Sequence, residues 1–154
     1  MATLDSLFLA ESFAIDQATN RLSLFNITEN LTFADVSGGG SSGKVGLLLS
    51  KLYAISIWRF DEEELGDKIV IRLRITGNEE RSATTEILVR GHTHRVIQGI
   101  VLTPPKAGQD IPKEFLFELF LGDESDRRGE YRIKVNVPEG SGSSTESETK
   151  DKEE

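Results

Sequence analysis

The segment I-V-I-R-L-R-I-T, Ile69 to Thr76, places a large aliphatic residue at every second position, with mainly polar residues between them. A period of two, rich in β-branched residues, is typical of a strand that buries one face. Large apolar residues also occupy every second position of Tyr131–Val137, with polar residues between them, and of Phe115–Leu121, where Leu116, Glu118 and Phe120 stand between them. These three segments predict strands and indicate an all-β fold.

Five further segments extend this pattern on either side. Leu4–Ile15, Leu22–Phe33 and Tyr53–Phe60 are longer and more continuously apolar, as expected for strands that are buried on both faces or bent by a bulge. Thr84–Arg90 and Val96–Leu102 complete the set.

Strands at spacings of roughly ten to twenty residues, with no long helix between them, favour two packed sheets. We therefore expect an antiparallel β-sandwich of about eight strands, Ig-like or jelly-roll-like. A small β-barrel fits the same spacing and is the alternative. Between Leu24 and Phe25 the apolar residues change from even-numbered to odd-numbered positions, and this parity switch predicts a bulge in the strand. The segment Val45–Leu52 is the one place where a short helix could form.

The chain of 154 residues is long enough for one domain of ordinary size, which we place at residues 1–138. The segment 139–154 has no large apolar residue and carries six acidic and two basic residues. Such a segment cannot bury enough surface to fold, so we expect a disordered acidic tail. Glycine and serine at 37–43 predict a flexible loop.

Composition excludes several classes of function. The chain has no cysteine, which rules out a disulfide framework, Cys-bound zinc and a thiol nucleophile. A net charge of −8 argues against a nucleic-acid partner, which requires a basic surface. No apolar run approaches the length of a membrane span, and no leader pattern opens the sequence. We expect a cytoplasmic location in a bacterial type of cell.

Two regions carry a family resemblance. The run L-F-L-A-E-S-F-A-I-D, Leu7–Asp16, is followed by the polar turn Q-A-T-N-R and an apolar strand from Leu22, and G-E-Y-R-I-K-V-N-V spans Gly129–Val137. Together they resemble a family of small, uncharacterised bacterial β-sandwich proteins, a domain of unknown function. The resemblance implies the fold and brings no activity with it, and the Gly/Ser loop stands out from the pattern as an insertion.

Two acidic loops, D-E-E-E-L-G-D and G-D-E-S-D-R-R-G, raise the possibility of calcium as a cofactor. If the strands alternate in direction, these loops gather at one pole together with Asp16 and the turn at His92. Calcium takes about six to eight oxygen ligands, which clustered carboxylates can supply. Acid-rich turns also serve to keep loops solvated, and Arg127 and Arg128 would neutralise part of the cluster. The candidate metal ligands are Asp16, Asp61, Glu62, Asp67, Asp123 and Asp126.

Two other motifs bear on chemistry. Gly38–Lys44 matches the spacing of a phosphate-binding loop, but Val45 stands where a hydroxyl should hold magnesium. His92 and His94 would point to the same side of a strand and could share a metal, but no third ligand lies near them in the sequence. No catalytic set of residues emerges, so we expect a protein that is not an enzyme.

The most favoured function is a protein-interaction or structural module, which binds an unknown protein partner or associates with itself through an edge strand. Trp58 and Phe60 close a strand beside an acidic loop and are the candidate partner contacts, with the rim of the core as the other interpretation. A calcium-binding sandwich is the alternative, and an enzyme of unknown class is the third hypothesis.

Overall fold

The computed structural model of the chain describes residues 1–35, 45–47, 51–103, 105 and 109–136. These residues form ten strands and one short 3₁₀ helix, rather than about eight strands. The elements are β1 (Thr3–Ile15), β2 (Leu22–Ile27), β3 (Asn30–Asp35), β4 (Val45–Leu47), β5 (Lys51–Arg59), η1 (Glu62–Glu64), β6 (Lys68–Thr76), β7 (Glu80–Leu88), β8 (Thr93–Val101), β9 (Glu114–Leu121) and β10 (Arg127–Asn136).

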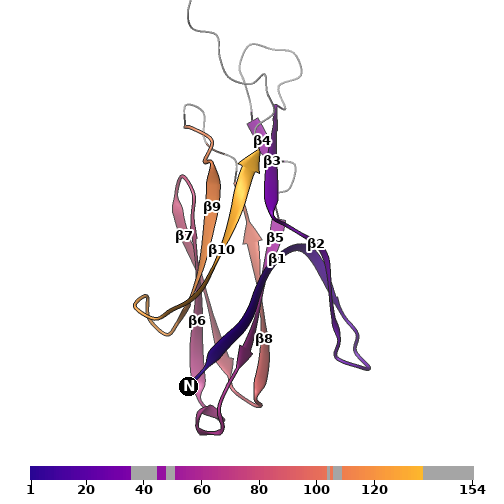
Figure 1. The fold of residues 1–154 in the computed structure, drawn as a ribbon, viewed down its shortest axis with the longest axis vertical. Coiled ribbons are helices and arrows are strands. Elements are labelled where there is room, and N and C mark those ends of the chain that lie inside the picture. The colour runs from indigo at the N-terminus through magenta and orange to yellow at the C-terminus, as the bar shows by residue number, and fades with distance from the viewer. Residues whose placement is uncertain (36–44, 48–50, 104, 106–108, 137–154) are drawn as a thin grey trace, which may run out of the picture.

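The strands form two sheets that pack together (Figure 1), so the all-β prediction is confirmed. One sheet has four strands in the order β2-β1-β5-β8, and the other has six in the order β4-β3-β10-β9-β6-β7. Neighbouring strands run antiparallel, with the exception of the parallel pair β3 and β10. The prediction of an antiparallel fold is wrong for this pair. The chain crosses to the six-stranded sheet after β2, and β3 enters that sheet alongside β10 and in the same direction.

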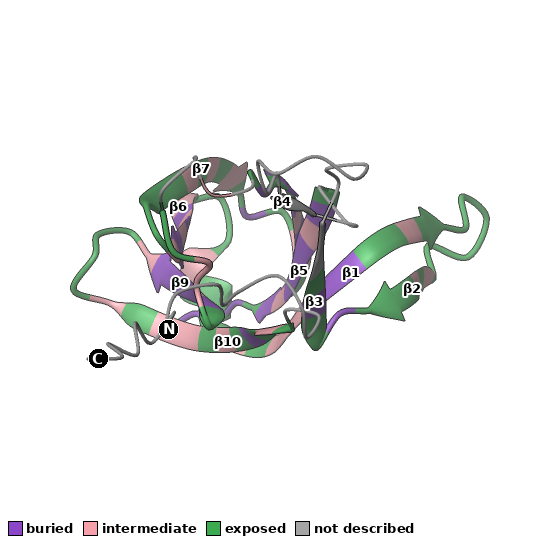
Figure 2. Ribbon diagram, turned by 90° about the horizontal axis from the view of Figure 1, so that it is seen from above, coloured by how far each residue is buried: buried purple, intermediate pink, exposed green. Residues whose placement is uncertain are grey.

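The two sheets also meet along their sides. Arg128 on β10 donates a hydrogen bond to the carbonyl of Ala2 at 2.9 Å, beside the start of β1. On the opposite side, the buried amide of Gln98 on β8 donates to the hydroxyl of Thr85 on β7 at 3.1 Å. Seen from above, the strands of the body surround a common core, while β2 and the end of β1 project to one side (Figure 2). The architecture therefore combines features of the sandwich and of the small barrel.

The core lies between the inner rows of the two sheets. On β6 the row includes Ile71 and Leu73, and on β9 it includes Phe117 and Leu119, all fully buried. Each large apolar side chain removed from water contributes about 1.5–3 kcal/mol. On β6 the alternation that predicted the strand is the pattern of a single buried face, whereas on β9 Glu118 and Phe120 are buried on the other face as well.

The segment Leu22–Phe33 is not one strand. The chain ends β2 at Ile27 and begins β3 at Asn30, and the amide of Thr28 donates to the carbonyl of Leu9 at 2.8 Å in between. Asn26 adopts a left-handed backbone, with φ of 53°, just before this crossing. The expected bulge between Leu24 and Phe25 is absent, because the register against β1 runs unbroken through both residues. The parity switch instead marks a strand with apolar residues on both faces.

The helix expected at Val45–Leu52 is also wrong over its described part. Residues 45–47 form β4, and residues 51 and 52 begin β5. The predicted Gly/Ser loop at 37–43 and the predicted acidic tail at 139–154 lie outside the described residues.

Candidate functional site

A hairpin arm stands beside the body of the molecule. β1 pairs with β5 as far as Ala10, and beyond that residue only β2 accompanies it. Figure 1 shows this end of β1 bending away from the body, with β2 returning beside it. We call residues Glu11–Ile27 the arm.

Contacts at both ends hold the arm to the outer side of the four-stranded sheet. Near its base, the ring of Phe13 meets that of Tyr53 edge-on, with 5.0 Å between centroids. At its tip, Arg95 on β8 donates a hydrogen bond to the main-chain carbonyl of Asn20 at 2.8 Å. The turn itself is closed by Asp16, whose side chain accepts hydrogen bonds from the amides of Ala18 and Thr19 at 2.8 and 3.0 Å. The arm is therefore positioned on the body and is not an isolated hairpin.

The two faces of the arm differ in burial. Phe13, Leu22 and Leu24 lie on the inner face and are half-buried. The outer face carries two large apolar side chains, Phe25 and Ile27, each 50 % exposed. Its remaining members are small and exposed, and none is charged. The outer face consists of Ser12, Ala14, Ser23, Phe25 and Ile27.

β2 is also an edge strand of its sheet. Edge strands present unpaired N–H and C=O groups, and most proteins protect them with charges, prolines or covering segments. The sequence of β2, L-S-L-F-N-I, contains neither a charged residue nor a proline. An unprotected edge next to exposed apolar side chains is the arrangement expected of a surface that another chain covers.

The sequence did not single out Phe25 and Ile27 as functional. Their signal was the parity switch after Leu24, which indicates apolar residues on both faces of one strand. Trp58 and Phe60, the expected partner contacts, are 0 % and 1 % exposed and belong to the core. Trp58 donates its indole N–H to the hydroxyl of Ser56 at 2.8 Å. The prediction that these two aromatics are surface anchors is therefore wrong, because Trp58 on β5 and Phe60 just beyond its end both pack into the core.

Most of the acidic side chains proposed as calcium ligands already form hydrogen bonds or ion pairs with groups of the protein itself. Asp61 pairs with the amino group of Met1, an interaction that lowers the pKa of its carboxyl. Asp123 accepts hydrogen bonds from the hydroxyl and the amide of Ser125, which lower its pKa as well. Asp126 pairs with Arg128 at 2.6 Å.

Asp16 lies apart from the other acids, in the turn at the tip of the arm, and the hydrogen bonds from Thr19 and Ala18 lower its pKa. Glu62 is exposed in η1, and Asp67 accepts the amide of Val89 with its main-chain carbonyl. Over the part of the chain that the structure describes, no three or more His, Asp or Glu residues come together as a group that could hold a metal ion. The calcium hypothesis thus gains no support from the arrangement of these six acids.

The two histidines are tied to the main chain around them. Nδ1 of His92 lies 3.2 Å from the carbonyl of Phe60, and Nε2 of His94 accepts the amide of Arg90 at 2.9 Å. The ring of His94 also meets that of Phe60 edge-on at 5.6 Å. These contacts give both histidines a role in closing the end of the fold where β5 and β8 meet.

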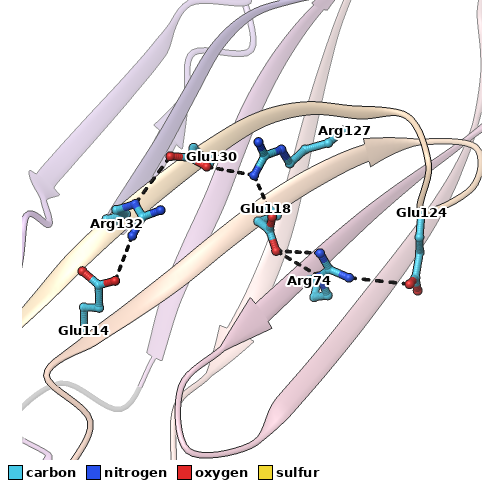
Figure 3. Close-up of polar contacts among 7 residues, drawn as sticks. All are labelled: Arg74, Glu114, Glu118, Glu124, Arg127, Glu130 and Arg132. Atoms are coloured by element: carbon cyan, nitrogen blue, oxygen red, sulfur yellow. Dashed lines mark hydrogen bonds and ion pairs between the residues drawn. The ribbon is translucent and has the colours of Figure 1, made fainter.

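The outer face of the six-stranded sheet carries a network of ion pairs (Figure 3). At its centre Glu118, with a side chain only 8 % exposed, accepts two hydrogen bonds from Arg74 at 2.8 and 3.0 Å and one from Arg127 at 3.0 Å. Burial alone would raise the pKa of the Glu118 carboxyl, but the bonds from the two arginines outweigh it and hold that pKa below its ordinary value.

The network continues in both directions from Glu118. Arg127 also pairs with Glu130 at 3.0 Å, and Arg132 joins Glu130 to Glu114 across β10 and β9. Arg74 lies over the ring of Phe120, 4.7 Å from its centroid. Charges on this face are thus largely matched within the protein, in contrast to the uncharged outer face of the arm.

A cavity of about 340 Å³ lies at the end of the body where β6 turns into β7. Its apolar lining includes Ile75, Leu102 and Phe115, and its polar lining includes Arg81, which donates to the hydroxyl of Thr103 at 2.7 Å. This volume is within the range of small-molecule sites, about 300–1,000 Å³. The cavity has room for a small molecule, but it does not test whether the protein catalyses a reaction, so the enzyme hypothesis stays a prediction.

No protein-family model and no curated protein matches this sequence. The class of protein is therefore defined by fold and surface alone, as an all-β domain with an exposed hairpin arm. Among the described residues, none of the helical structure is long and apolar enough to cross a membrane.

Proposed function

We propose that the protein is a non-enzymatic protein-interaction module that binds through the free edge and the outer face of its arm. The observation that carries this proposal is the exposure of Phe25 and Ile27 on an edge strand that has no charge and no proline. Binding by strand addition needs both elements, since the main chain supplies affinity and alternate side chains supply specificity.

The energetics favour covering this surface. Burying a Phe or Ile side chain completely contributes about 1.5–3 kcal/mol. Covering the exposed halves of Phe25 and Ile27 would therefore contribute about the same amount to the free energy of binding. The open edge adds main-chain hydrogen bonds to this contribution, each with a net value of about 0.5–1.5 kcal/mol. The arm is also held in place beforehand by Phe13 and Arg95, which reduces the entropy lost on binding.

Other parts of the described surface support the proposal less well. The outer face of the six-stranded sheet has its charges paired within the protein, and Trp58 and Phe60 are buried. The outer face of the arm combines apolar area with an absence of charge, which is the character of an interface core.

The test compares native particle sizes in cell extract for the wild type and for a Phe25→Lys variant. We expect the wild type to migrate as a species larger than the monomer, and Phe25→Lys to migrate as a monomer. Leu65→Lys is the matched control. Leu65 is likewise a large exposed apolar residue, 40 % exposed against 50 % for Phe25, but it lies beyond η1, away from the arm. A wild-type species of monomer size, or a larger species that Phe25→Lys leaves intact, would exclude this function.

A further inference from the structure

We propose that the cavity where β6 turns into β7 binds a small organic acid, which places its apolar body in the cavity and its carboxylate on Arg81. This inference goes beyond the proposed function, because the residues that line the cavity lie outside the arm. It gives the protein a second binding surface, for a small molecule and not for another chain.

The core of the protein is open at this cavity. Three residues of the apolar lining, Ile75, Leu102 and Phe115, belong to the core cluster. They are 8 %, 5 % and 8 % exposed, and every other buried apolar residue among those described is at most 4 % exposed. The apolar surface that the core leaves uncovered is therefore largely gathered here, where a ligand can reach it.

The size of the cavity fits a small molecule with an apolar body. Its volume is about 340 Å³. A cavity of about 150 Å³ lined by aliphatic and aromatic side chains holds one benzene molecule. A short alkyl chain or an aromatic ring system therefore has room in this larger cavity.

The wall of the cavity is positioned before a ligand binds. The side-chain amide of Asn78, in the turn between β6 and β7, donates a hydrogen bond to the main-chain carbonyl of Asp110, ahead of β9. Pro105 and Pro112 also line the cavity, and a proline ring fixes the backbone at its position. Such positioning reduces the entropy that is lost when a ligand binds.

Arg81 occupies an unusual position for a charged residue. It lies opposite Ile75 in the antiparallel register of β6 and β7, and such cross-strand neighbours point to the same face of the sheet. Because Ile75 is buried in the core, Arg81 belongs to the inner row of β7, at the end of the core. The following members of that row are uncharged: Ala83, Thr85 and Ile87. The open end of the core leaves the guanidinium of Arg81 accessible to a ligand.

The guanidinium of Arg81 retains donors that a ligand can use. Its Nη2 donates to the hydroxyl of Thr103 at 2.7 Å and lies 3.5 Å from a carboxylate oxygen of Glu79. Within the described part of the chain, Nε and Nη1 of Arg81 have no hydrogen-bond partner. A carboxylate matches the planar donors of a guanidinium, and one guanidinium balances its single charge, whereas a phosphate group carries up to about two charges. A carboxylate is therefore the anion that this site fits.

Octanoate and octanamide form a matched pair of probes, since they share an alkyl chain and differ in charge. The purified full chain is titrated with each probe up to about 10 mM, and binding is followed by NMR of the isoleucine and leucine methyl groups. We expect saturable shifts at Ile75 and Leu102, with octanoate bound at least about ten-fold more tightly than octanamide. The methyl signals of Ile27, on the arm, should not shift.

A variant of Arg81 separates the charge from the apolar contacts. Arg81→Gln should weaken the binding of octanoate at least about ten-fold and leave the affinity for octanamide unchanged, because the contacts of the alkyl chain remain. Retained binding of octanamide also shows that the variant is folded with its cavity intact. Arg59→Gln is the matched control, since Arg59 is an exposed arginine paired with Asp5 at 2.6 Å and is not part of the cavity lining. It should bind both probes as the wild type does.

The opposite results overturn the inference. Octanoate that does not saturate the wild type up to about 10 mM, or that shifts Ile27 instead of Ile75 and Leu102, shows that the cavity is not its site. Equal affinities for the two probes, or an unchanged affinity of Arg81→Gln for octanoate, show that Arg81 does not bind a carboxylate. None of these results changes the outcome of the Phe25→Lys experiment, so the failure of one proposal is distinguishable from the failure of the other.

Discussion

Arg95 donates a hydrogen bond from Nη2 to the main-chain carbonyl of Asn20, 2.8 Å away, although the two residues are 75 positions apart. Asn20 has a left-handed backbone, with φ of 53°, in the turn of the arm, and Arg95 projects from β8 on the outer side of the four-stranded sheet. The bond therefore ties the far end of the arm to a strand with which the arm has no ladder. It sets the position in which Phe25 and Ile27 are presented.

Replacing Arg95 should loosen the arm while the body stays folded. A hydrogen bond of this kind contributes about 1 kcal/mol. Hydrogen exchange at the amides of β2 should therefore become about five-fold faster in Arg95→Ala, with little change on β6 and β9. Arg59→Ala is a suitable control, because it removes an exposed pair with Asp5 away from the arm. Unchanged exchange at β2 would show that the arm does not depend on this bond.

Glu118 should make stability depend on acidity. The pKa of the Glu118 carboxyl is lower in the folded protein than its ordinary value of 4.5. The ionised carboxylate therefore stabilises the fold fully at pH values above 4.5. This contribution is lost as the pH falls through the folded pKa. Glu118→Gln should lose about 1–3 kcal/mol at pH 7, and its stability should depend less on pH than that of the wild type as the pH falls below 4.5. Urea unfolding across this range measures both effects.

The control for Glu118 lies on the same strand. Glu114→Gln removes a single pair with Arg132 on an exposed side chain, so we expect at most about 1 kcal/mol. Equal losses for the two variants would contradict a special role for the buried carboxylate.

Sequence predicts a strand well where one face is buried and the other is polar. β6 and β10 alternate in this way. The expected range of β6, Ile69–Thr76, agrees closely with the observed strand, whereas that of β10, Tyr131–Val137, misses the first residues of a strand that begins at Arg127. The alternation fails at Leu22–Phe33, because β2 has apolar residues on both faces and β3 belongs to another sheet. Local pattern carries no information about which sheet a strand joins.

The candidate site was predicted less well than the fold, for a similar reason. Trp58 and Phe60 lie two positions apart near an acidic loop, but their burial is decided by the core residues that pack against them from elsewhere in the chain. Alternating strand directions predict that Asp16 lies at the same pole as Asp61, whereas the arm carries Asp16 away from the body. Phe25 and Ile27 could have been found from the parity switch after Leu24.

The buried hydrogen bond of Trp58 offers a test of its place in the core. Ser56→Ala leaves the indole N–H without its acceptor in a fully buried position, which should cost about 1–3 kcal/mol. Thermal unfolding followed by the fluorescence of this single tryptophan measures the loss. A stability equal to the wild type would indicate that the indole finds another acceptor.

Gly77 allows the ring of Phe115 to pack beside the turn between β6 and β7. A methyl group built on Gly77 would lie 2.6 Å from Cε1 of Phe115, too close for any pair of carbon atoms, so the ring or the turn must move in Gly77→Ala. Overpacking of this kind costs about 1–3 kcal/mol. Gly91→Ala is the matched control, because nothing lies within 4 Å of the added carbon and its backbone is unstrained, so we expect no loss and a gain of up to about 1 kcal/mol. Phe115 also lines the cavity, so a crystal structure of Gly77→Ala should show a changed cavity floor; wild-type stability in this variant would mean that the ring yields without cost.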